Sequence, residues 1–202
     1  MTTPAASIKD AARYGGLTMF KTLAIVAATV VGAATAWAED APRRPWAQLN
    51  DGPVMILGAG ALGLRGQTGD NRAAIVDAEW RGSALLGPLK PVLGLAVTSK
   101  GGGDVWAGIA ADIPILDGWY LVPGVAPSGY AHGGGLALGS AFELRDSLAL
   151  EYRLDNDCRF GLEGAYLSNL GLGNRDPGTE TAMLTLTLPL GWHSSAARIA
   201  NR

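Results

Sequence analysis

The segment 179–190 constrains the fold most strongly, because its residues alternate in character without interruption. The side chains of one parity are mostly threonine: Thr181, Met183, Thr185 and Thr187. The side chains of the other parity are apolar: Ala182, Leu184, Leu186, Leu188 and Leu190. Successive side chains of a β-strand point to opposite faces. The segment is therefore predicted to be a two-faced strand, with Glu180 at the head of its leucine face.

Seven further runs with strand character precede this segment, and clusters of Gly, Asn, Asp and Pro separate them as turns. The predicted strands are 53–65, 72–81, 90–100, 103–115, 119–130, 142–154, 157–169 and 179–190. Runs of this length joined by turns, with few good helix formers in series, predict an all-β fold. We expect an eight-stranded antiparallel β-barrel.

The strand 142–154 shows how charge is distributed between the two faces. One face is apolar apart from Asp146: Phe142, Leu144, Leu148, Leu150, Tyr152 and Leu154. The other face is polar: Glu143, Arg145, Ser147, Glu151 and Arg153. A soluble barrel would bury the apolar face, whereas a membrane barrel turns it toward lipid and pairs the charges inside. The pattern alone fits both.

Three features favour the transmembrane β-barrel: an export signal, strands long enough to cross a bilayer when tilted, and charge that is largely confined to one face. A closed barrel also leaves no strand edge unpaired in lipid. Aromatic residues near strand ends predict an interfacial girdle: Trp80, Trp119, Tyr120, Tyr130 and Trp192. The inward charges are expected to form a buried ion-pair network: Arg145, Glu151, Arg153, Arg159 and Glu163. A soluble periplasmic barrel that binds an apolar ligand remains the alternative.

The N-terminal 38 residues have the form of a secretory signal peptide. A basic start at Lys21 is followed by an apolar run and by Ala36-Trp37-Ala38, an Ala-x-Ala exit. We expect residues 1–38 to be removed, with Met19 as a possible true start. Residues 39–52 then form an extended lead, 53–192 the barrel and 193–202 a C-terminal tail. Export and a barrel together predict the outer membrane of a Gram-negative bacterium.

Charge and cysteine content exclude several functions. The formal net charge is −2 and the basic residues form no patch, so nucleic acid is not an expected partner. The single cysteine, Cys158, cannot form an internal disulfide. The sequence contains no metal-ligand motif and no phosphate loop, so no cofactor is predicted. The expected partners are outer-membrane lipids.

Polar residues at the ends of the last two strands are the main indication of function. The predicted strand 157–169 places Tyr166 and Ser168 on one apolar face, and Glu180 heads the facing strand. The turn between them is rich in Gly and Pro. A hydroxyl and a carboxylate among residues that face acyl chains have no purely structural explanation.

The segment RFGLEGAYLSNLGLGNRDPGTE, from Arg159 to Glu180, resembles the active-site segment of the lipid A 3-O-deacylase family, also called acyloxyacyl hydrolases. The family motif is His-x-Ser-Asn, a Gly-containing turn with Asn-Pro, and a Glu twelve residues after the Ser. Here Ser168-Asn169 match, Gly171 lies in the turn, and Glu180 has the family spacing. The resemblance covers about residues 136–191. The histidine position holds Tyr166, and Asp176-Pro177 replaces Asn-Pro.

The resemblance implies an eight-stranded outer-membrane barrel that removes an ester-linked acyl chain from lipid A or lipopolysaccharide. It implies Ser168 as nucleophile, Tyr166 at the position of the base and Glu180 as the acid that orients the base. Asn169, Gly171 and Asp176 would form the turn and the oxyanion site.

Tyrosine titrates near pH 10, so Tyr166 is a neutral phenol at pH 7 and cannot take the proton of Ser168. Loss of a general base costs about 10² to 10⁴ in rate. Two hypotheses follow. In one, the protein is a weakened ester hydrolase in which Glu180 assists Ser168. In the other, it is a non-catalytic barrel that binds lipid A or stabilises the membrane.

Overall fold

The computed structural model describes residues 52–64, 72–173 and 176–190, which form strands and turns. The strands are β1 (Val54–Leu62), β2 (Ala73–Arg81), β3 (Leu89–Thr98), β4 (Gly103–Ala111), β5 (Ile113–Leu116), β6 (Trp119–Ala131), β7 (Phe142–Arg153), β8 (Arg159–Ser168) and β9 (Thr179–Pro189). Over the described residues, no helix has the length and hydropathy that a membrane crossing requires. The all-β prediction is confirmed.

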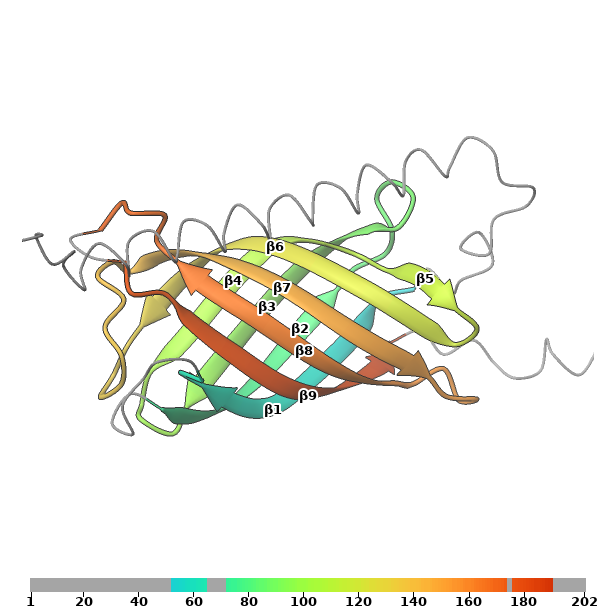
Figure 1. The fold of residues 1–202 in the computed structure, drawn as a ribbon. Coiled ribbons are helices and arrows are strands. Elements are labelled where there is room, and N and C mark those ends of the chain that lie inside the picture. Colours follow the sequence, from blue (N-terminus) through green and yellow to red (C-terminus); the bar gives the residue numbers. More distant parts are fainter. Residues whose placement is uncertain (1–51, 65–71, 174–175, 191–202) are drawn as a thin grey trace, which may run out of the picture.

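The strands form one closed antiparallel barrel (Figure 1). Each strand pairs with its neighbours in the chain, β1 pairs with β9, and β4 pairs with β6. The short strand β5 continues β4 after Asp112, and both pair with β6. Together β4 and β5 correspond to the predicted strand 103–115. Counted as one strand, they give the barrel the eight strands that were predicted. The proposed signal peptide, the lead 39–52 and the tail 193–202 lie outside the described residues.

The outer surface of the barrel is apolar. The side chains of Leu184, Leu162, Phe160 and Val105 are 72%, 59%, 59% and 59% exposed, although all four lie within strands. The inward side chains of β9 are buried threonines and Met183. Leu184, Leu186 and Leu188 therefore have the outward orientation that the alternation predicts. Apolar side chains also pack inside the barrel, but buried threonines and charged residues share the lumen with them. An apolar exterior around a lumen that holds charged side chains is the arrangement of a membrane barrel, and it contradicts the alternative of a soluble barrel whose apolar faces are all buried.

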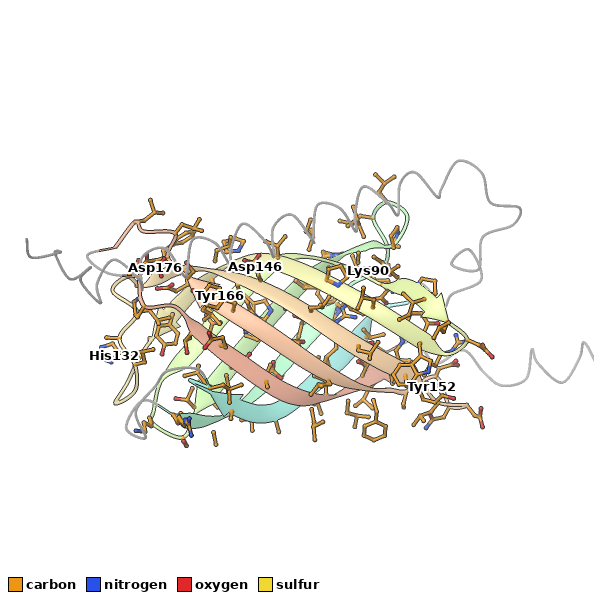
Figure 2. The ribbon with its side chains drawn as sticks, in the orientation of Figure 1. Lys90, His132, Asp146, Tyr152, Tyr166 and Asp176 are labelled. Carbon is orange, nitrogen blue, oxygen red and sulfur yellow. The ribbon has the colours of Figure 1, made fainter. Side chains whose placement is uncertain are left out.

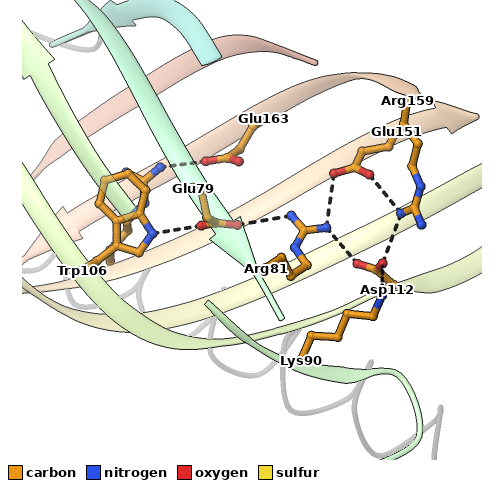
Figure 3. Close-up of polar contacts among 9 residues, drawn as sticks. Glu79, Arg81, Lys90, Trp106, Asp112, Glu151, Arg159 and Glu163 are labelled. Atoms are coloured by element: carbon orange, nitrogen blue, oxygen red, sulfur yellow. Dashed lines mark hydrogen bonds and ion pairs between the residues drawn. The ribbon is translucent and has the colours of Figure 1, made fainter. Parts of the chain in front are cut away.

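Charged side chains fill one part of the lumen as an ion-pair network (Figure 3). Asp112 contacts three cations, with N···O distances of 2.8 Å to Arg81 and 3.2 Å to both Arg159 and Lys90. Glu151 contacts Arg159 at 3.1 Å and Arg81 at 3.4 Å. All five side chains are buried. Charges out of contact with water are tolerated when each has an opposite partner.

A second ion pair, Arg145–Glu163 at 2.7 Å, completes most of the predicted set of inward charges. The guanidinium of Arg145 also lies 4.4 Å from the ring centroid of Trp106. Arg153 has a different contact, since its guanidinium lies 5.9 Å from the ring of Tyr120. The prediction of a buried network is thus confirmed for all members except Arg153.

The predicted aromatic girdle is only partly correct. Trp80 and Trp119 lie on the outer surface, 38% and 37% exposed. Tyr120 and Tyr130 are 2% and 8% exposed and point into the lumen, so their assignment to the girdle was wrong. Tyr120 follows Trp119 directly, and adjacent strand residues face opposite ways. Trp192 lies outside the described residues.

The two ends of the barrel differ in their connections. The short turns 82–88, 117–118 and 154–158 lie at the end where β1 begins and β9 ends. The connections 63–72, 99–102, 132–141 and 169–178 lie at the other end. Outer-membrane barrels have short periplasmic turns and longer extracellular loops. The second end is therefore the extracellular one.

Placing arginine at the centre of the outer surface should destabilise the barrel. Leu184 is the middle residue of β9, so we expect Leu184→Arg to lower the free energy of unfolding by about 2–4 kcal/mol in lipid. The matched control is Leu172→Arg, because Leu172 is 74% exposed in the loop 169–178. Its expected effect is below about 0.5 kcal/mol. Urea unfolding in phospholipid vesicles measures both, and equal effects would contradict a lipid-facing β9.

Candidate functional site

The register between β8 and β9 brings the predicted site residues onto one face. Tyr166 and Glu180 are direct cross-strand partners, and Ser168 lies two residues beyond Tyr166 on the same, outward face. All three lie where β8 ends and β9 begins, at the extracellular end of the barrel. Figure 2 shows Tyr166 and Asp176 close together at that end. The side chains therefore lie near the extracellular rim of the barrel.

The hydroxyl of Ser168 is hydrogen-bonded to a carboxylate. It donates to Asp176 Oδ2 at 2.8 Å and accepts the backbone N–H of Leu170 at 3.1 Å. The same carboxylate accepts the N–H groups of Asn169 at 3.3 Å and Gly171 at 3.2 Å. Ser168 is only 4% exposed, whereas Asp176 is exposed. Asp176, predicted as a turn residue, is thus also the acid that contacts Ser168.

The turn after Ser168 is fixed by backbone geometry and by Asn169. Leu170 and Gly171 both have positive φ angles, 59° and 76°. Asn169 is fully buried, its Oδ1 accepts the N–H of Gly171 at 2.9 Å, and its Nδ2 donates to Leu138 O at 3.0 Å. Positive φ is strained for leucine, and such strain persists only where surrounding contacts enforce it. The contact to Leu138 ties this turn to the neighbouring loop 132–141.

Tyr166 lies across Gly178, the residue that faces Ser168 when the β8–β9 register is continued. Gly178 has a φ of 58°, and a Cβ atom added to it would collide with the Tyr166 hydroxyl. Glycine is thus required at this position for two reasons: the backbone has a positive φ, and the Tyr166 phenol leaves no room for a side chain. The phenol group is thereby placed beside the Ser168–Asp176 pair.

The side chain of Glu180 is not hydrogen-bonded to the other described site residues, although the resemblance implies a contact with the residue at position 166. Its backbone carbonyl accepts the N–H of Gly63 at 2.9 Å. Among the described residues, no side-chain hydrogen bond joins Glu180 to Ser168 or to Tyr166. The Ser168 hydroxyl is directed to Asp176 instead.

Asp146 is a further acidic residue on this surface, and the sequence reasoning did not count it as part of the site. It is the cross-strand partner of Tyr166 on β7, is 9% exposed and has one carboxylate oxygen without a hydrogen-bond partner. Asp146, Tyr166 and Glu180 therefore form a row across β7, β8 and β9. The sequence did contain a sign of its role, because Asp146 is the one charged residue on the otherwise apolar face of the predicted strand 142–154.

The described part of the chain contains no group of three or more His, Cys, Asp and Glu side chains placed to hold a metal ion. His132 is exposed in the loop 132–141, and His193 lies outside the described residues. The chemistry available at the site is therefore that of a hydroxyl, a carboxylate that accepts its proton, a phenol and backbone N–H groups.

The C-terminal half of the barrel matches a known family. The family model "Lipid A 3-O-deacylase (PagL)" matches residues 116–189, from the end of β5 to the end of β9. This range contains every residue of the site, and it confirms the resemblance stated from the sequence. No match was found among curated proteins.

Two solved structures were found in a comparison of folds. The crystal structure of the outer membrane enzyme PagL has a TM-score of 0.50 and 17% sequence identity, covering 68% of this chain and 99% of that one. The outer membrane protein Ail of Yersinia pestis, solved in a phospholipid bilayer nanodisc, has a TM-score of 0.44 and 11% identity, covering 68% and 98%. A closed barrel with an apolar exterior, together with the family match, places the chain in the outer membrane of a Gram-negative bacterium.

Proposed function

From the match of residues 116–189 to the lipid A 3-O-deacylase family, we propose that this outer-membrane barrel hydrolyses an ester-linked acyl chain of lipid A, with Ser168 as nucleophile. One observation supports this most directly. The Ser168 hydroxyl donates to Asp176 at 2.8 Å at the extracellular end of the lipid-facing surface. Lipid A acyl chains lie in the outer leaflet, so the ester group reaches this position without entering a deep pocket.

In the proposed reaction Asp176 takes the proton of Ser168 while Oγ attacks the acyl carbonyl carbon. The ester C–O bond then breaks, and the departing sugar oxygen takes the proton from Asp176. Water attacks the acyl-serine, again giving its proton through Asp176, and the fatty acid leaves as Ser168 is regenerated. The overall change is ester plus water to acid plus alcohol. The phenol of Tyr166 would donate a hydrogen bond to the carbonyl oxygen as it gains negative charge.

This arrangement predicts slow turnover. A carboxylate is a weaker base than the histidine of the family motif, and histidine matches neutral pH much better. Ser168 is also nearly buried below its turn. The second candidate function, in which the barrel binds lipid A without cleaving it, rests on these two features.

Release of 3-hydroxy fatty acid from purified lipid A separates the two functions. We expect measurable release by the wild-type barrel and a loss of at least about 10²-fold in Ser168→Ala. The matched control is Ser147→Ala on β7, because Ser147 has the same inward parity as Arg145 and Glu151. Equal release by wild type and Ser168→Ala would exclude the hydrolase and leave the lipid-binding function.

A further inference from the structure

The extracellular part of the lumen contains two carboxylates without partners. Glu143 on β7 is fully buried and Asp104 on β4 is 5% exposed. All four of their carboxylate oxygens lack a hydrogen-bond partner among the described residues. Deeper in the lumen, Asp112, Glu151 and Glu163 are all paired with arginine. Two ionised carboxylates without a counter-charge are strongly unfavourable in a buried position, so they are either protonated or neutralised by a positive group.

The register between β4, β6 and β7 brings these groups toward one another. Asp104 faces Tyr130 on β6, and Ser128, two residues earlier on the same inward face, faces Glu143 on β7. Ser128 is 5% exposed, and its hydroxyl oxygen also lacks a partner among the described residues. It adds a third buried oxygen to the same part of the lumen.

Arg145, an arginine on the same inward face of β7, is already paired with another carboxylate. Arg145 lies two residues from Glu143 on β7 and shares its inward parity. Its guanidinium bonds to Glu163 at 2.7 Å and lies over the ring of Trp106. No ion pair in the described part of the chain involves Glu143 or Asp104. Among the described residues, no cation is therefore paired with these two carboxylates, and a cation bound from solution would balance their charge.

The loop 132–141 closes the lumen above these groups. Leu138 and Leu167, each 1% exposed, pack with Tyr130. The Tyr130 hydroxyl donates to Leu136 O at 2.9 Å, and Asn169 holds Leu138 O at 3.0 Å. Bulk water is therefore kept away from the two carboxylates, which makes their neutralisation more important.

We propose that Asp104, Glu143 and Ser128 bind a hard divalent cation, with Ca²⁺ preferred, inside the extracellular end of the barrel. Carboxylate and hydroxyl oxygens are the ligand type that Ca²⁺ and Mg²⁺ select. Two carboxylates match the charge of one divalent ion, and bound waters complete the coordination shell, as is common for these ions. Ca²⁺ tolerates irregular ligand geometry better than Mg²⁺. The site is separate from Ser168 and does not depend on the proposed hydrolase activity.

Terbium provides the direct test, because Tb³⁺ occupies calcium sites and luminesces when an excited Tyr or Trp lies nearby. Tyr130 faces Asp104, and Trp106 lies two residues from it on β4. We expect the refolded, EDTA-treated barrel to give saturable Tb³⁺ luminescence that Ca²⁺ displaces. Asp104→Asn and Glu143→Gln should each weaken Tb³⁺ affinity at least tenfold. Asp117→Asn, in an exposed periplasmic turn, is the control and should leave the affinity unchanged.

Thermal unfolding supplies a second readout. Ca²⁺ at a hundredfold excess over its Kd should raise the Tm of the wild type by about 5–10 °C and leave Glu143→Gln unchanged. In EDTA, Glu143→Gln should be at least as stable as the wild type, because it removes a charge that lacks a partner. Absence of saturable luminescence, equal Tb³⁺ affinity in Glu143→Gln and Asp117→Asn, or neutralisation by protons with no Ca²⁺ response would each overturn the proposal.

Discussion

Replacing Tyr166 by histidine should raise the rate of lipid A ester hydrolysis by about 10² to 10⁴-fold, the usual contribution of a general base. The substitution supplies a group that accepts a proton at neutral pH. The structure already provides the geometry for it, since Glu180 is the cross-strand partner of position 166 and Ser168 lies on the same face. The measurement is 3-hydroxy fatty acid release by Tyr166→His and by the wild type.

The role of Asp176 can be tested in the same assay by a double-mutant cycle. In the wild type, Asp176→Asn should lower the rate about 10²-fold or more, because it removes the one carboxylate that is hydrogen-bonded to Ser168 among the described residues. In the Tyr166→His variant the loss should be much smaller, because the histidine replaces Asp176 as base. Equal losses in both backgrounds would show that Asp176 only maintains the turn through Asn169 and Gly171.

Neutralising Asp112 should destabilise the barrel by about 3–5 kcal/mol. Asp112 is 2% exposed and is the shared partner of Arg81, Arg159 and Lys90. Asp112→Asn leaves Arg81 with Glu79 and Glu151 and leaves Arg159 with Glu151, while Lys90 loses its ion pair, so buried positive charge loses part of its compensation. The measurement is the free energy of unfolding in urea, with the barrel in phospholipid vesicles.

The control for this experiment is Asp117→Asn, five residues along the chain in an exposed turn. It removes the same charge with no buried partner, and we expect a change within about 0.5 kcal/mol. A comparable effect of both substitutions would mean that overall charge, and not the buried network, sets the stability.

The strands themselves were predictable from the sequence, because period-two alternation is a direct consequence of strand geometry. The predicted segment 179–190 becomes β9 at Thr179–Pro189, and 142–154 becomes β7 at Phe142–Arg153. The alternation alone left open which face points outward; the export signal and the strand lengths favoured the apolar face, and the paired charges of the lumen confirm it. Once Arg145 and Glu163 are seen in contact inside the barrel, the leucines of β9 have to face lipid.

Other features depend on contacts between distant parts of the chain and were missed. The predicted strand 103–115 is divided at Asp112, whose side chain joins the ion network from Arg81 and Arg159. Tyr120 was assigned to the girdle by its nearness to a strand end. Its parity and its contact with Arg159, 4.1 Å from the ring centroid, place it in the lumen.

The family motif located the site but did not give its hydrogen bonds. The spacing predicted that Ser168 and Glu180 share a face, which the register shows. It could not predict that a turn would bring Asp176 to the Ser168 hydroxyl. That contact depends on the positive φ angles of Leu170 and Gly171, which only the folded loop reveals.

The row Asp146, Tyr166 and Glu180 lies on the outer wall of the barrel and faces the membrane plane. This position determines how the proposed lipid A substrate would reach it. A lipid arrives by lateral diffusion within its own leaflet, so the encounter takes place in two dimensions. Occupancy then follows the mole fraction of that lipid in the surface and not its amount per volume of solution. Adding inert phospholipid at a constant quantity of lipid A should therefore dilute the interaction, while adding buffer should not.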